Sequence, residues 1–239
     1  MCIRDRPVGN GLPWWYFLTP GNPLQGLRLA SVDPNGRIER ALPLGQVLGG
    51  SVMASCSCPA PGVVRHHSGG KVVIGEPAGG ASDRASDWAQ VLTAAGLPTA
   101  ASTDIRRDLW MKLLGNACSN PLSLITQATT DRIVDNPGTR AVFKNLLTEC
   151  LALGRRAGLT LDVDVQQRIA QTRQLGAIKT SMLQDLEAGR WVELDAILAA
   201  PLECAARLEF DAPWLKTVFA LAGLRAAQAG LYGDHGVSG

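Results

Sequence analysis

The character of the sequence changes at Asp104, and this change restricts the fold more than any other feature. Over residues 27–103, short β-compatible runs alternate with turns rich in Gly and Pro. After Asp104 the strand patterns stop, and apolar residues recur with the 3.6-residue period of helices. The sequence therefore predicts an α/β part over residues 1–103 and an all-helical part over residues 104–239.

Turn and cap residues place the expected elements within these two parts. Strands are expected at residues 27–32, 46–56, 62–66, 71–74 and 99–102, with a helix at 83–95 that begins at Ser82 or Asp83 and stops at Gly96. Further helices are expected at residues 106–120, about 121–127, 137–157, 163–175, 181–188, 191–209 and 213–230. Pro121 should break or kink the first of these, because it lacks a backbone N–H.

Composition excludes several classes of function. A net charge of +2 without a Lys/Arg cluster gives no reason to expect nucleic-acid binding. No apolar run reaches the ~18 residues of a membrane span, and no signal peptide is recognised. The six scattered cysteines suit reduced thiols rather than a disulfide framework, so a cytoplasmic protein is expected.

Polar side chains on one face of the helix expected near residue 110 suggest a binding site. Lys112, Asn116 and Asn120 are spaced i, i+4, i+8, so their tips project to neighbouring points. One ammonium and two carboxamides can donate several hydrogen bonds to an oxygen-rich small molecule. The alternative is the solvated face of an amphipathic helix. The single charge and the two helix-disfavouring asparagines argue against that alternative.

The same stretch belongs to a specific set of motifs. The first runs from Asp104-Ile105 through Trp110-x-Lys112-Leu-Leu-x-Asn116-x-x-x-Asn120-Pro-Leu. The second is Thr180-Ser181-Met182-Leu183-Gln184-Asp185-Leu186-Glu187-Ala188-Gly189-Arg190, followed by Glu193-Leu-Asp195-Ala196-Ile197. Asn10-Gly11-Leu12 and the segment Pro61-Gly62-Val63-Val64-Arg65-His66 complete the set. In order and spacing these motifs resemble the ketopantoate reductase family over roughly residues 8–232.

The resemblance implies an NADPH-dependent reduction of 2-dehydropantoate (ketopantoate), or of a similar 2-keto acid, in pantothenate biosynthesis. It implies a Rossmann-like NADP-binding domain, of which residues 1–103 are the C-terminal part. A helical substrate and dimerisation domain of the 6-phosphogluconate-dehydrogenase type, residues 104–239, would follow. Lys112 takes the family's general-acid position. The resemblance further implies substrate contacts for Asn116, Asn120 and Ser181, a cofactor contact for Glu193, and both contacts for Asn10.

Each carried-over residue also has a simpler interpretation. Ser181-x-x-Gln184 before an apolar run is a capping box, so the Ser181 hydroxyl would cap a helix. Glu193, between Val192 and Leu194, would be a charged-face residue of the expected 191–209 helix. Asn10-Gly11 alone is a turn signal.

Two other motifs have structural alternatives that are favoured. Cys56-x-Cys58 with His66-His67 lacks the spacing and the second pair of a zinc site, so a hairpin position is favoured. The aromatic run over residues 14–17 is expected in a core or an interface rather than as a stacking platform.

The sequence departs from the family in three respects. No Gly-x-Gly-x-x-Gly turn is present, and residues 1–6 match nothing around them. We therefore expect a non-native start, an N-terminally truncated enzyme that binds cofactor poorly and is inactive alone, and a tendency to aggregate through an unpaired sheet edge. Ile178 and Thr130 stand where the family has substrate-contacting asparagines. The exact substrate and the choice between NADP and NAD stay open.

Two other interpretations remain at this stage. One is a related dehydrogenase of the β-hydroxyacid group, acting on another hydroxy acid. The other is a non-catalytic helical module that dimerises or binds a partner, in which Lys112, Asn116 and Asn120 need not converge with Ser181 and Glu193. Homodimer packing of the Ala- and Leu-rich helical part is left open.

Overall fold

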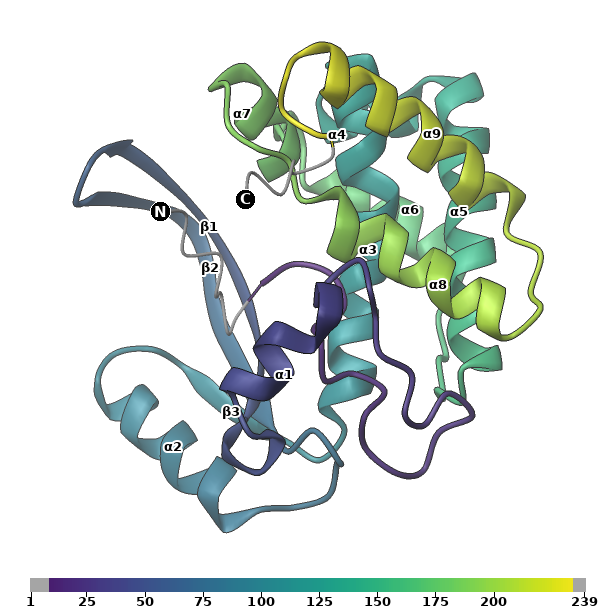
Figure 1. Cartoon of the computed structure of the whole chain (residues 1–239). Coiled ribbons are helices and arrows are strands. Elements are labelled where there is room, and N and C mark those ends of the chain that lie inside the picture. The colour runs from purple at the N-terminus through teal and green to yellow at the C-terminus, as the bar shows by residue number, and fades with distance from the viewer. Residues whose placement is uncertain (1–8, 234–239) are drawn as a thin grey trace, which may run out of the picture.

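The computed structural model describes residues 9–233, without the side chains of hairpin residues 55, 57–59, 67 and 68. The proposed non-native start at residues 1–6 lies outside the described residues. Figure 1 shows a small α/β lobe with a long protruding hairpin and a larger lobe made of helices. The change of character at Asp104 thus coincides with the passage from one lobe to the other.

The α/β lobe is built on a three-stranded sheet in the order β1-β2-β3. Strand β1 (Gly49–Ala60) pairs antiparallel with β2 (Val63–Gly75), and β2 pairs parallel with the short β3 (Thr99–Ser102). Helix α2 (Asp83–Ala94) connects β2 to β3, and the Ser82 hydroxyl caps it by accepting the Ala85 N–H. The remaining elements of this lobe are the short helices η1 (Pro34–Gly36), α1 (Arg37–Ala41) and η2 (Leu44–Gln46).

Two strand predictions in this lobe were wrong. The segment at residues 27–32 is a series of turns, because the N–H groups of Ala30 and Ser31 bond the carboxylate of Glu203 instead of a partner strand. The runs at residues 62–66 and 71–74 form one strand, β2. They look separate in sequence because Gly69 and Gly70, with φ of +77° and +146°, lie at a register shift opposite Met53 and Ala54.

The helical lobe follows the predicted pattern closely. Its elements are α3 (Ile105–Thr126), α4 (Thr130–Asp135), α5 (Pro137–Arg156), α6 (Val165–Gln174), α7 (Ser181–Glu187), the π-helical turn η3 (Asp195–Ala199), α8 (Ala200–Arg207) and α9 (Pro213–Gln228). The expected break at Pro121 was wrong, since α3 runs through it. Proline removes one hydrogen bond of the helix, and the buried residues Leu122 and Leu124 beyond it hold the helix in the core.

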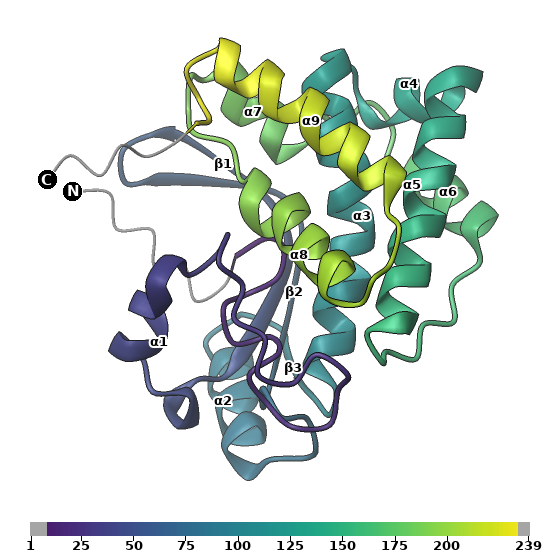
Figure 2. The ribbon, with the colours of Figure 1, turned by 45° about the vertical axis from the view of Figure 1, so that its right-hand side comes forward.

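One apolar core joins the two lobes. Trp15, Tyr16 and Phe17 are each no more than 3% exposed, which confirms the core interpretation of the aromatic run. The Tyr16 hydroxyl donates to the carbonyl of Arg106 on α3, and the ring lies 6.1 Å from that of Trp110. The aromatic segment is thereby packed against the first turns of α3, and in Figure 2 the purple trace of this part of the chain runs between α1 and α3. Within the described residues, no helix is long and apolar enough to cross a membrane.

Candidate active site

Two polar residues of the candidate site, Lys112 and Asn116, are on helix α3. Asp104 caps the helix by accepting the Arg107 N–H at 3.1 Å. Trp110, Leu113, Leu114 and Ala117 are buried on its core-facing side. Lys112 and Asn116, one turn apart, are left partly exposed on another side of the helix. The predicted polar face is therefore present, but it is recessed rather than fully solvated.

A hydrogen-bonded chain links α3 to two distant segments. The Asn116 amide donates to the Asn10 side-chain oxygen at 3.1 Å, and the Asn10 amide donates to a carboxylate oxygen of Glu193 at 2.9 Å. All three side chains are partly buried. Three separate segments therefore bring together Asn10, Asn116 and Glu193. A non-catalytic helical module would not require this convergence.

The turn at Gly11 explains how Asn10 reaches this position. Gly11 has a φ of +82°, and a Cβ added there would lie 2.1 Å from the carbonyl oxygen of Ala196. The next residue, Leu12, donates its N–H to that same oxygen at 2.9 Å. Only glycine allows the backbone to approach η3 this closely, and Asn10 is placed beside Glu193 as a result.

Glu193 lies just before η3, not inside a helix as predicted. Residues 191–193 are irregular, and helical geometry begins at Leu194. The Val192 N–H donates to the carbonyl of Leu231, and the Tyr232 hydroxyl donates to the Asp195 carboxylate at 2.7 Å. These contacts, made by residues that follow α9, fix the segment that contains Glu193. Sequence reasoning missed them, and no spacing motif points to Tyr232.

Lys112 has the electrostatic setting of a proton donor. Burial lowers the pKa of its ammonium below the ordinary value for lysine, and the negative charge of Glu193 partly opposes this shift. Within the described residues, no hydrogen bond or ion pair engages the ammonium. A lysine with these properties can both stabilise and protonate a developing oxyanion.

Ser181 and Asn120 are placed differently. Ser181 is the first residue of α7 and is exposed, whereas Asn120 is 5% exposed on α3. The capping interpretation of Ser181 was wrong, because Thr180 accepts the Leu183 N–H and is the N-cap. Helix α7 packs against α3. No hydrogen bond joins either residue to the Asn10 chain in the part of the molecule described here.

Comparisons with known proteins show the family of the chain. Residues 104–226 match the family model described as "Ketopantoate reductase PanE/ApbA C terminal". The chain is 39% identical to a 2-dehydropantoate 2-reductase of Mesorhizobium japonicum over 93% of its own length and 68% of the relative's. The chain belongs to the ketopantoate reductase family.

Solved structures of the family give the same result. A crystal structure assigned as a ketopantoate reductase of Ralstonia solanacearum superposes with a TM-score of 0.90 and 43% identity, over 94% of this chain and 68% of that one. The 2-dehydropantoate 2-reductase of Methylococcus capsulatus gives 0.76 and 29%, over 82% of this chain and 68% of that one. The chain spans 68% of the length of the curated relative from Mesorhizobium japonicum and 59% of the 2-dehydropantoate 2-reductase of Halobacterium salinarum. D-mandelate dehydrogenase, at 20% identity and a TM-score of 0.73, shares the fold.

The two positions that depart from the family pattern lie side by side in the structure. Thr130 is 3% exposed, and its N–H donates to the carbonyl of Ile178 at 3.0 Å. The Ile178 side chain is 38% exposed. The Thr130 hydroxyl is engaged by a carbonyl of the same loop, that of Gly176, at 2.7 Å. In this chain the side chain of Thr130 therefore forms its hydrogen bond with the protein's own backbone.

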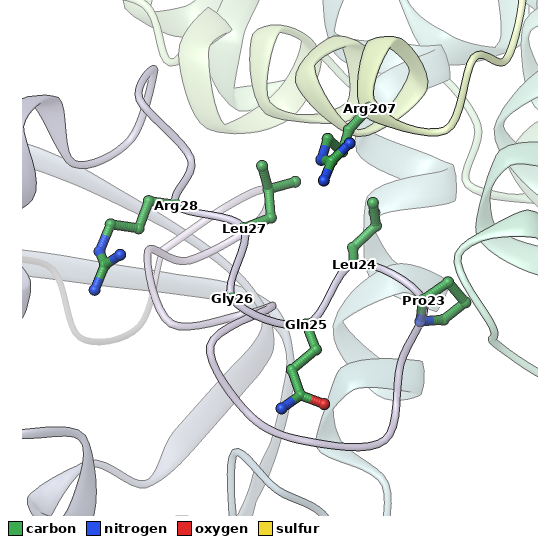
Figure 3. Close-up of a pocket in the computed structure, with 7 residues that line it drawn as sticks. All are labelled: Pro23, Leu24, Gln25, Gly26, Leu27, Arg28 and Arg207. Atoms are coloured by element: carbon green, nitrogen blue, oxygen red, sulfur yellow. The ribbon is translucent and has the colours of Figure 1, made fainter.

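Two other features lie apart from the site. A surface cleft of about 260 Å³ is lined by residues 23–28 and Arg207 (Figure 3). The guanidinium of Arg28 is paired with Glu39. The cleft includes none of the residues named above for the active site. Among the described residues no cluster of three metal-ligating side chains is present, and the side chains of Cys58 and His67 lie outside the described part.

Proposed function

We propose that this chain carries the site at which 2-dehydropantoate, or a similar 2-keto acid, is reduced to the 2-hydroxy acid with NADPH, with Lys112 as the general acid. The observation that carries the proposal is the half-buried Lys112 ammonium beside the Asn116–Asn10–Glu193 chain, in a member of the ketopantoate reductase family. Residues 1–103 would be part of a Rossmann-like NADP-binding domain, and residues 104–239 the substrate domain. We also propose a cytoplasmic location.

The chemistry needs one proton donor at a fixed point. The cofactor, when bound, supplies a hydride to the carbonyl carbon of the keto acid. The C=O double bond then becomes a C–O single bond, and the oxygen gains negative charge and must take up a proton. The Lys112 ammonium donates that proton and becomes a neutral amine. A lowered pKa favours this transfer, because the ammonium releases its proton more easily than an exposed lysine would.

The neighbouring polar groups fit a keto acid and the nicotinamide end of a cofactor. The amides of Asn116 and Asn120, one turn apart on α3, and the Ser181 hydroxyl would bind substrate oxygens. Asn10 and Glu193 would bind the amide or hydroxyl groups of the cofactor beside the reacting carbon. The sequence of 239 residues contains no Gly-x-Gly-x-x-Gly turn, so the residues present account for the nicotinamide end alone. The preference for NADPH rests on the family assignment.

A second substrate is favoured by one observation. At the loop before α7, the exposed side chain of Ile178 is apolar, and the Thr130 hydroxyl is engaged by Gly176. These positions offer a substrate fewer hydrogen bonds than asparagines would. A related 2-keto acid with an apolar substituent is therefore the alternative substrate, and comparing kcat/KM across a series of keto acids decides between the two.

The proposal is tested with Lys112→Met and a matched control, Lys144→Met on the exposed face of α5. Turnover is followed as NADPH oxidation in a complete enzyme, in which this chain is joined to a segment with the Gly-x-Gly-x-x-Gly turn. Binding of 2-dehydropantoate is measured by calorimetry on the chain itself. Loss of a general acid should lower kcat by about 10²–10⁴-fold. Binding of the keto acid should change little, and Lys144→Met should resemble the unmodified chain. Normal turnover by Lys112→Met, or absence of keto acid binding to the unmodified chain, would contradict the proposal.

We further propose that the chain pairs with a second copy through the outer face of α9. Trp214, Leu221 and Leu224 are 36%, 51% and 61% exposed there, and a relative from Staphylococcus aureus is described as dimeric. Both views place α9 on the outer side of the helical lobe (Figures 1 and 2). Leu221→Lys should shift the sedimentation coefficient to that of a monomer, whereas Val64→Lys, at a hairpin position that is 67% exposed, should not. A monomer at every concentration in the unmodified chain would contradict pairing.

A further inference from the structure

The turn before α7 is attached to α4 by three hydrogen bonds. The Thr130 hydroxyl donates to the carbonyl of Gly176 at 2.7 Å, and the Asp131 N–H donates to the same oxygen at 3.3 Å. The Thr130 N–H donates to the carbonyl of Ile178 at 3.0 Å. The first turn of α4 therefore binds two carbonyls of the Gly176–Ile178 turn.

This attachment differs from the others in the same segment because it is buried. The Arg173–Asp135 ion pair lies upstream of the turn, and the Lys179–Glu187 pair lies downstream. All four of these charged side chains are 44–61% exposed, so each pair contributes little and is screened by salt. Thr130 is 3% exposed, so its hydroxyl cannot exchange the Gly176 carbonyl for water. Deleting the hydroxyl would leave the Gly176 carbonyl with one longer bond to α4, from the Asp131 N–H, beside the bond at 2.8 Å from the Ile178 N–H of its own turn.

Little chain separates the turn from the candidate substrate contact. Ile178 is followed by Lys179, by the buried cap Thr180, and then by Ser181. The Thr180 hydroxyl is committed to the Leu183 N–H inside α7. A displacement of the turn should therefore also move the first residue of α7, because only two residues separate the turn from it. Ser181 itself is exposed, and among the described residues none forms a hydrogen bond with its hydroxyl.

We propose that Thr130 is a positioning residue for the substrate end of the site. Its hydroxyl fixes the Gly176–Ile178 turn, and through this turn it places the Ser181 hydroxyl for the keto acid. The inference rests on the proposed function, because it assigns Ser181 to a keto acid. It adds a residue that contacts no substrate and acts through the backbone of a neighbouring loop.

The experiment measures binding of 2-dehydropantoate by calorimetry to the full chain and to four variants. Thr130→Val and Thr130→Ala delete the hydroxyl, and Thr130→Ser retains it. Thr19→Val is the matched control, since the Thr19 hydroxyl is 4% exposed and also donates to a loop carbonyl, that of Pro77, at 3.1 Å. Unfolding in urea confirms that each variant folds, and amide hydrogen exchange reports on residues 176–183. Two deletion variants keep the test decisive if one of them does not fold.

The expected result is a loss of affinity of about 10- to 100-fold in the deletion variants, the range that follows a misplacement of about 1 Å. Faster exchange at residues 176–183 should accompany it, Thr130→Ser should restore both, and Thr19→Val should lose stability without losing affinity. Unchanged affinity in the deletion variants would overturn the inference, even with faster exchange. An equal loss of affinity in Thr19→Val would also overturn it, by showing a general effect of stability. If the unmodified chain binds no keto acid, the proposed function itself fails.

Discussion

Replacing Gly11 with alanine should destabilise the protein and displace the backbone that positions Asn10. The residue has a φ of +82°, which costs a residue with a Cβ about 1–2 kcal/mol. The added Cβ would also lie 2.1 Å from the Ala196 oxygen, far inside van der Waals contact. The backbone must then retreat from η3, which costs about 1–3 kcal/mol in repacking. The retreat breaks the bond from the Leu12 N–H, a donor on a fully buried residue, for about 1–3 kcal/mol more.

The sum is a loss of about 3–8 kcal/mol in the free energy of unfolding, and the chain provides its own control. Gly21 has nearly the same φ, +85°, but open space where a Cβ would stand. Gly21→Ala should therefore cost only the conformational strain, about 1–2 kcal/mol. Urea unfolding followed by circular dichroism measures both. Equal losses in the two variants would refute the argument that close approach to Ala196 requires glycine.

Three further outcomes are expected. Glu193→Gln removes the charge that opposes the effect of burial, so the pKa of Lys112 should fall further. The lysine then loses its proton at lower pH. An NMR titration of the Lys112 Cε signal measures this shift, and the alkaline limb of the pH profile of kcat should move in the same direction. Glu149→Gln should lower the free energy of unfolding by about 2–3 kcal/mol, because the buried carboxylate accepts two N–H groups at the start of α9 at 2.7 and 3.1 Å. Glu203→Gln, at a less buried carboxylate, should lower it by less, and urea unfolding measures both variants. Pro121→Ala should raise the free energy of unfolding by about 1–3 kcal/mol, seen as a higher urea midpoint, since α3 is continuous there. A lower midpoint would indicate that the proline ring is needed for packing.

The helices were predictable because their signals are local. The Ser82 cap, the stop at Gly96 and the Asp211-Ala212-Pro213 turn are read within a few residues, and the structure has helices beginning or ending there. The expected strand at residues 27–32 failed for the opposite reason. Its apolar residues suit a strand, but the carboxylate that satisfies its N–H groups is on α8, more than 170 residues away along the chain.

The site divides in the same manner. Lys112 and Asn116 share a face because both are on α3, which spacing alone predicts. The meeting of Asn116 with Asn10 and Glu193 joins positions 106 and 183 residues apart, and no periodicity contains that information. Family resemblance singled out these residues, and the structure brings them into contact. The cap at Thr180 was missed because Thr180 and Ser181 are adjacent and both are good N-cap residues.

One residue in the sequence does carry a signal for the central contact of the site. Pro201 has no N–H, and the Ala200 N–H bonds the carbonyl of Asp195 across the π-helical turn η3. A π-helical partner for the Ala196 carbonyl would have to come from Pro201, which cannot donate. That carbonyl is therefore left to accept the Leu12 N–H, and Gly11 allows the approach. A proline inside the predicted 191–209 helix thus leads, through one freed carbonyl, to the position of the asparagine that contacts both Asn116 and Glu193.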